Sequence, residues 1–186
     1  TAIAHHLLVR ASPPGDQALA TARHSYDPSQ RRQLLLHGLS TLVETQTVEG
    51  ATRVLQDLQE VGAPPSIHAQ LDRLLQLDAE DHALRVVAAQ WALLNSEPSR
   101  ALEILDGVSA DGPNGATSIA VTRIEAMERS GLFALAQAQL DALGPAEPGY
   151  WGLKVVLARG RLALAGGAVQ RARGLFRKAA GWAHDL

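Results

Sequence analysis

The spacing of the apolar residues constrains the fold of this chain most strongly, because it is helical along almost all of the 186 residues. No run of β-branched residues alternates with polar ones between turn signals, as a half-buried strand would. Groups of Pro, Gly, Asn and Asp interrupt the pattern and leave segments of helical length. We therefore expect an all-α fold of about 10 to 11 helices. The expected helices span 2–10, 16–25, 29–45, 48–60, 66–77, 81–94, 98–105, 116–129, 132–143, 150–165 and 168–183.

The composition suits a fold made of packed helices. Hydrophobic residues make up 46% of the chain and aromatic residues only 4%, so the core has to be built from Leu, Ala and Val. Short connections leave consecutive helices little choice but to pack as antiparallel neighbours. No segment approaches the run of about 18 apolar residues that a membrane span needs. We expect a protein that makes no contact with membranes.

Charge and cysteine content limit the partners and the compartment. The formal net charge is −2, whereas nucleic-acid binding usually requires a strong basic excess. The absence of cysteine excludes disulfides and thiolate metal sites. The chain begins at Thr1 without a signal-peptide pattern. We expect a cytoplasmic location, no direct binding of nucleic acid, and an origin as a piece of a longer protein with flanking domains.

A repeat of about 35 residues is visible in the second half of the chain. Three expected helices carry an Ala followed four residues later by a large apolar residue, namely Ala101 with Leu105, Ala136 with Leu140 and Ala172 with Phe176. The three alanines are 35 and then 36 residues apart. Twelve residues before them stand Ala89, Ile124 and Gly160, and twelve residues after the first two stand Pro113 and Pro148.

This pattern resembles the tetratricopeptide repeat (TPR), whose unit of about 34 residues has Ala-x3-Phe in its second helix and a closing Pro. The resemblance implies a right-handed superhelix of antiparallel helix pairs, a TPR-like α-solenoid, as a single domain over 1–186. Three better-matched units would lie in 82–186. Degenerate helices would fill 1–81, including a fourth unit at Ala51, and Gly160 and Ala172 would be close helix contacts of the last pair. A non-repetitive bundle with the same spacing is the alternative.

No motif for catalysis or phosphate binding is present, so we expect no enzyme, no catalytic residue and no cofactor. The densest group of possible metal ligands is Asp78-Ala-Glu-Asp-His82. We expect Asp78 and Asp81 to act as helix N-caps there, with no metal site. Trp91 lies in a strongly apolar segment and is expected in the core, whereas Trp151 and Trp182 are equally compatible with a core or an interface.

Binding is the activity that stacked helix pairs offer, because their first helices line a concave surface. By resemblance this groove receives an extended peptide or a partner helix. Its residues would be Lys154, Leu157, Arg161 and Leu164, with Val121, Glu125 and Glu128 from the preceding unit. Lys154 and Arg161 either hold a carboxylate together or are ordinary solvated cations. We expect a protein- or peptide-binding scaffold; the alternative is a ligand- or partner-sensing regulatory domain of a larger bacterial signal-transduction or transcription regulator.

Overall fold

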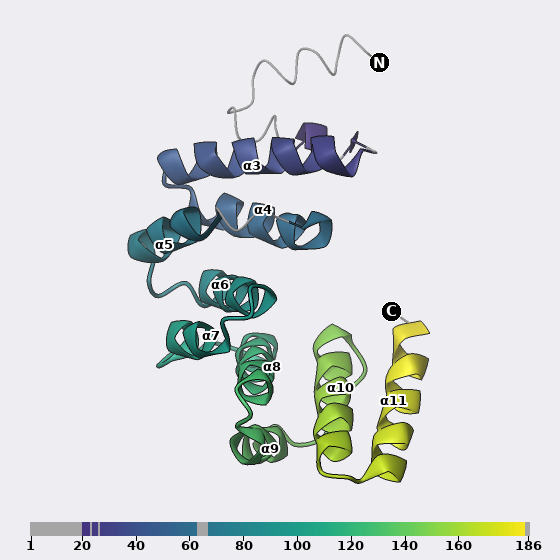
Figure 1. Ribbon diagram of the computed structural model, residues 1–186. Helices are drawn as coiled ribbons and strands as arrows, with labels where there is room; N and C mark the ends of the chain where they lie inside the picture. Colours follow the sequence, from purple (N-terminus) through teal and green to yellow (C-terminus); the bar gives the residue numbers. More distant parts are fainter. Residues whose placement is uncertain (1–19, 23, 26, 63–66, 185–186) are drawn as a thin grey trace. The chain divides into compact units, whose positions relative to one another are not determined.

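The computed structural model describes residues 20–22, 24–25, 27–62 and 67–184, and within them it contains helices and no strands (Figure 1). The all-α prediction is confirmed for this part of the chain. The expected helix at 2–10 lies outside the described residues, and of the one at 16–25 only residues 20–22 and 24 are described as helical. The helices with defined bounds are α3 (Pro28–Glu44), α4 (Val48–Val61), α5 (His68–Leu77), α6 (His82–Leu94), α7 (Pro98–Leu105), α8 (Pro113–Arg129), α9 (Phe133–Ala142), α10 (Tyr150–Ala165) and α11 (Val169–His184).

The chain divides into two compact units, Thr1–Val87 and Ala88–Leu186, and the division falls inside α6. In the first unit α3 packs against α4 and α5. The core positions of these helices are mainly leucines, namely Leu35, Leu39, Leu55, Leu58, Leu71 and Leu74. None of the described helices is both long enough and apolar enough to cross a membrane.

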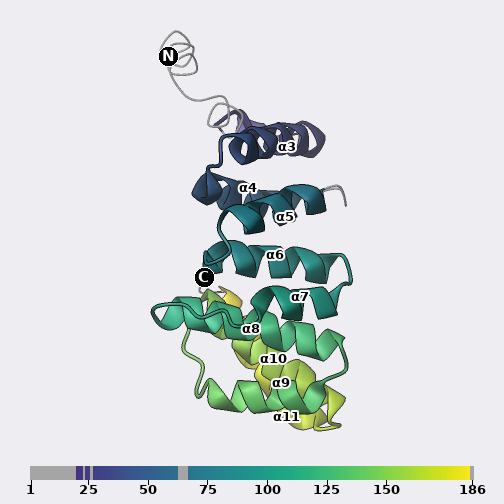
Figure 2. The same cartoon turned by 90° about the vertical axis from the view of Figure 1, so that its left-hand side faces the viewer.

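In the second unit α8 and α10 are the central helices. α8 packs against α7, α9 and α10, and α10 also packs against α9 and α11. Figure 2 shows α8 and α9 side by side, and Figure 1 shows the same for α10 and α11. The core cluster of this unit is formed by Val121, Ile124, Ala136, Leu140, Val155, Ala158 and Leu162.

Four helix pairs close with the same turn: α3–α4, α6–α7, α8–α9 and α10–α11. One residue of each turn has positive φ, namely Gln46 (58°), Ser96 (63°), Gly131 (74°) and Gly167 (77°). In every turn the amide of the next residue donates to the carbonyl five residues before it, at 2.8 to 2.9 Å. This is the Schellman arrangement that ends a helix. The four positions precede Ala51, Ala101, Ala136 and Ala172 by five residues each, so the turns follow the spacing of the alanines in the sequence.

The small residues of the pattern are all in the core. Ala51, Ala101 and Ala136 are fully buried and Ala172 nearly so. Gly160 is also buried, and a Cβ added to it would lie only 2.6 Å from Cε1 of Phe176 on α11. The expected close approach of the last helix pair at Gly160 is therefore confirmed.

Two arginines at matching positions tie each central helix to the end of the helix before it. Arg123 of α8 donates to the carbonyl of Leu105. Arg159 of α10 donates to the carbonyl of Leu140 at 3.2 Å and to that of Gly144. These carbonyls belong to the last turn of a helix or follow it, where no intrahelical donor remains. The guanidinium groups therefore use acceptor capacity that the helices leave free, although the carbonyl of Leu105 also accepts from the amide of Val108 at 3.2 Å.

Candidate functional site

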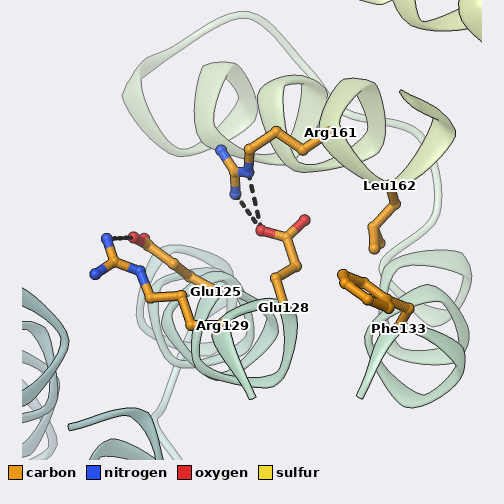
Figure 3. A pocket seen from close by; sticks show the side chains of 6 residues that line it. All are labelled: Glu125, Glu128, Arg129, Phe133, Arg161 and Leu162. Atoms are coloured by element: carbon orange, nitrogen blue, oxygen red, sulfur yellow. Dashed lines mark hydrogen bonds and ion pairs between the residues drawn. The ribbon is translucent and has the colours of Figure 1, made fainter. Parts of the chain in front are cut away.

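A pocket of about 390 Å³ opens between α8, α9 and α10 of the second unit (Figure 3). We call it the α8–α10 pocket. Its lining residues are Glu125, Glu128 and Arg129 from α8, Phe133 from α9, and Arg161 and Leu162 from α10.

Helical spacing places the three α8 residues of the pocket on one side of it. Glu125, Glu128 and Arg129 stand at i, i+3 and i+4, and therefore share one face of α8. α8 ends at Arg129, and the turn at Gly131 brings Phe133 to the first position of α9. The packing of α10 against α8 then supplies Arg161 from the opposite side.

Two ion pairs order the charged part of the pocket. Arg161 reaches from α10 to α8, where its Nη2 and Nε lie 2.6 and 2.9 Å from Oε2 of Glu128. Arg129 binds Oε1 of Glu125 at 2.7 Å through Nη2 and the carbonyl of Leu93 at 2.6 Å through Nη1. The formal charges of the four side chains cancel, so the pocket has no strong preference for one sign of charge.

Glu128 is the least satisfied polar group of the pocket. Its side chain is only 10% exposed, and its second oxygen, Oε1, is buried without a hydrogen-bond partner among the described residues. Figure 3 shows this oxygen on the side of the carboxylate that faces Leu162. Burial raises the pKa of Glu128, and the hydrogen bond and charge of Arg161 offset only part of that rise. Oε1 therefore keeps an unused acceptor, although the oxygen is covered in the structure.

The remaining wall is apolar. Phe133 is 49% exposed, which is unusual for so large a ring, whereas Leu162 is buried and belongs to the core cluster. A half-exposed aromatic ring beside a buried carboxylate offers a ligand both apolar contact area and an acceptor.

The structure brings together only part of the groove expected from the sequence. Glu125, Glu128 and Arg161 line the α8–α10 pocket. Val121 is 5% exposed and lies in the core cluster, so its side chain offers almost no surface to a partner. Arg161 does hold a carboxylate, but it is the one of Glu128.

The other three expected groove residues lie elsewhere. The ammonium of Lys154 stands 5.5 Å from the centre of the Tyr150 ring. Leu157 is half-buried, and Leu164 lines a separate hollow beside α11. Arg129, Phe133 and Leu162 also line the α8–α10 pocket but are absent from the expected groove. Arg129 could have been predicted from the sequence, because its four-residue spacing from Glu125 places both on one face of α8. Nothing in the sequence indicates that Phe133 would be exposed.

Of the two aspartates expected to be helix N-caps, Asp81 caps α6 as predicted, whereas Asp78 lies at the C-terminal end of α5 and accepts from the loop before α6. Oδ1 of Asp81 accepts from the amides of Ala83 at 2.8 Å and Leu84 at 3.1 Å, and Oδ1 of Asp78 accepts from the amide of Asp81 at 3.1 Å. Within the described ranges no three His, Asp or Glu side chains are grouped so that they could hold a metal ion.

The tryptophans divide between core and surface. Trp91 is buried, as predicted. Trp151 is half-buried against the core cluster of the second unit, and its ring meets that of Tyr150 edge-on at 4.9 Å. Trp182 is half-buried and carries the Lys178 ammonium 4.5 Å from its ring centre.

No protein-family model matches the chain, and no curated protein or solved structure is significantly similar to it.

Proposed function

We propose that this chain is a protein-binding module that receives an extended peptide segment in the α8–α10 pocket. The observation that carries this proposal is the pairing of the exposed Phe133 ring with the unpartnered Oε1 of Glu128. An apolar side chain of the peptide would contact Phe133 and Leu162. A peptide amide would donate to Oε1 and so remove the cost of a buried acceptor without a partner, about 1 to 3 kcal/mol.

The resemblance to tetratricopeptide repeats supports the same reading. The four helix pairs share one turn geometry at the spacing of the Ala pattern, as expected for repeated units. In that family the surface lined by the first helices of the pairs receives peptides, and α8 and α10 are the first helices of their pairs. The paired charges of the pocket also suit an uncharged backbone better than a strongly charged ligand.

Access to Oε1 requires a movement. The oxygen is covered in the unbound chain, so a donor reaches it only when a neighbouring side chain shifts. Phe133 is half-exposed and has more room to move than the buried Leu162. We therefore assign Phe133 the role of an apolar anchor that also uncovers the carboxylate.

A small ligand sensed on behalf of a larger regulator is the second candidate. Its support is the pocket volume of about 390 Å³, which lies within the usual range for ligand sites. Two results together would favour this alternative. A compound raises the melting temperature of the wild type but not of Phe133→Ala, and no peptide is found that binds through Phe133.

The peptide proposal is tested by selecting binders from a random peptide library on the wild-type chain and measuring their dissociation constants against variants. Phe133→Ala should weaken binding by about tenfold or more, because a central aromatic anchor is lost. Glu128→Gln should weaken it as well: while the amide oxygen stays on Arg161, the amide nitrogen replaces the acceptor with a donor.

Leu135→Ala is the matched control. Leu135 is an exposed apolar residue of α9, like Phe133, but does not line the pocket. Selected peptides should bind this variant as they bind the wild type. Equal binding to Phe133→Ala and wild type would refute the proposed pocket.

A further inference from the structure

The last helix pair carries an unusual charge distribution. Between Tyr150 and His184 there is no Asp or Glu, whereas seven Lys or Arg residues occur in this stretch of a chain whose net charge is −2. Several of these cations are engaged by the fold: Arg159 binds carbonyls, Arg161 binds Glu128, and Lys154 and Lys178 lie over aromatic rings. Arg171, Arg173 and Arg177 remain, all on α11.

These three arginines have no hydrogen bond or ion pair with any described residue. All three are exposed on a helix that contains no acidic residue within Val169–His184. Three like charges on one helix raise the local positive potential, which an acidic partner would lower. The exposed surface of α11 is therefore positively charged, and no described acidic side chain neutralises these arginines.

Arg173 and Arg177 border an apolar depression of about 590 Å³, which we call the α10–α11 hollow. Its other lining residues are Leu164, Val169, Ala172, Phe176 and Ala180. Leu164 and Val169 are 51% and 57% exposed. Among the described helices α11 packs mainly against α10, so no other described helix packs extensively over this apolar surface.

The shape of the hollow selects the class of partner. Its α11 residues recur at three- and four-residue intervals and form a stripe along the helix. Ala180 is small and exposed and borders the depression, which leaves room for side chains that enter from outside. Nucleic-acid phosphates do not fill an apolar depression, and insertion into a bilayer favours protruding apolar groups. A second copy presenting the same surface would bring the basic α11 helices together and repel.

We propose that the α10–α11 hollow binds an acidic amphipathic helix of a protein partner. Apolar side chains of that helix fill the depression, and its carboxylates pair with Arg173 and Arg177. This is the helix-in-groove mode of recognition. It uses a surface separate from the α8–α10 pocket.

The test uses a fluorescein-labelled peptide of about 18 residues with Leu at every third or fourth position and Glu and Ala elsewhere. Fluorescence anisotropy measures its binding to the whole chain. We expect binding to the wild type that weakens by about tenfold or more in the double variant Arg173→Glu, Arg177→Glu, because attraction becomes repulsion. The same peptide with Lys in place of Glu should show the reverse preference.

Two controls separate this surface from general charge and from the pocket. Arg171→Glu changes the charge of α11 at a residue that does not line the hollow, and should weaken binding much less than Arg177→Glu. Phe133→Ala removes the anchor of the other site and should leave acidic-peptide binding unchanged. Leu164→Ala should weaken it, since apolar contact is lost.

Four results would overturn the proposal. The acidic peptide could fail to bind the wild type, or could bind the double variant equally well. The chain could bind phosphatidylserine vesicles or duplex DNA more tightly than the peptide. Finally, sedimentation could show self-association of the chain that Leu164→Ala abolishes.

Discussion

At the scale of single residues, Gly160 sets how closely the last two helices approach. It is buried in α10 against the ring of Phe176, and three ring atoms lie within 2.9 Å of the position a Cβ would take. Real Cβ atoms do not come so close to a ring, so even alanine forces a shift.

We predict that Gly160→Ala lowers the free energy of unfolding by about 1 to 3 kcal/mol, the usual cost of overpacking. Urea denaturation followed by circular dichroism measures it. Gly174→Ala is the matched control, because a Cβ at Gly174 on α11 meets no atom within 4 Å. That variant should be more stable than the wild type by about 0.5 to 1 kcal/mol. Phe176→Leu should recover part of the loss in Gly160→Ala, and equal destabilisation by the two alanines would contradict the contact.

Glu128 should make stability depend on pH in an unusual direction. Burial raises its pKa above the ordinary 4.5, and Arg161 offsets the rise only in part. The folded chain therefore holds this proton more tightly than the unfolded chain does. Protonated Glu128 therefore stabilises the folded chain. This contribution to the free energy of unfolding is fully present below the unfolded-state pKa of Glu128 and is lost as the pH rises through its folded-state pKa.

Glu128→Gln keeps an acceptor for Arg161 but cannot ionise. We predict that it is at least as stable as the wild type at pH 7, and that this advantage shrinks as the pH falls toward about 4. Melting temperatures of both proteins across this range measure the effect. Parallel curves would show that burial does not govern the titration of Glu128.

The candidate site shows what residue patterns reveal and what they omit. The sequence grouped Glu125, Glu128 and Arg161 because helical spacing and the repeat period fix which faces meet. It placed Val121 in the groove as well, since spacing alone does not say how deeply a residue is buried once neighbouring helices pack. It missed Phe133, because the exposure of an apolar ring depends on where the next helix passes.

At the scale of elements, the helices were largely predictable because breakers and caps are local. The bounds of α7 and α10 agree with the sequence analysis, and those of the other defined helices differ by a few residues. The largest difference is at α8, which begins at Pro113 and not at 116. In the repeat pattern, Pro113 is expected to close a unit. It stands instead in the first turn of a helix, where its fixed φ and missing amide do no harm.

The shared turns give a prediction at this scale. Gly131 adopts φ of 74° where Ser96 adopts 63° in the corresponding turn. A side chain at such an angle is strained by about 1 kcal/mol or more. Gly131→Ala should therefore lower the melting temperature. Ser96→Gly should raise it slightly, because relief of strain exceeds the added freedom of the unfolded chain. Changes of the same sign in both variants would contradict the equivalence of the turns.

At the scale of the whole molecule, the main helix contacts join near neighbours along the chain. α3 meets α4 and α5, and in the second unit each main contact spans at most two helices. The chain has no cysteine and so no disulfide to link distant parts. The breakers were sufficient to predict that α3 packs against α4, α8 against α9 and α10 against α11. They carry no information on the curvature of a stack, because that depends on small rotations between pairs.

Because helices pack mainly against near neighbours in the chain, we predict that a destabilising substitution unfolds only the helices around it. Gly160→Leu places a side chain far larger than a methyl group against Phe176 and should open α10 and α11. Amides in these two helices should then exchange with deuterium much faster than in the wild type, whereas amides in α3, α4 and α5 keep their protection. Mass spectrometry of peptic fragments measures this, with Gly174→Ala as the variant expected to leave every helix protected. Uniform loss of protection in Gly160→Leu would mean that the chain unfolds as one cooperative body, and its stability would then not be a sum of neighbouring contacts.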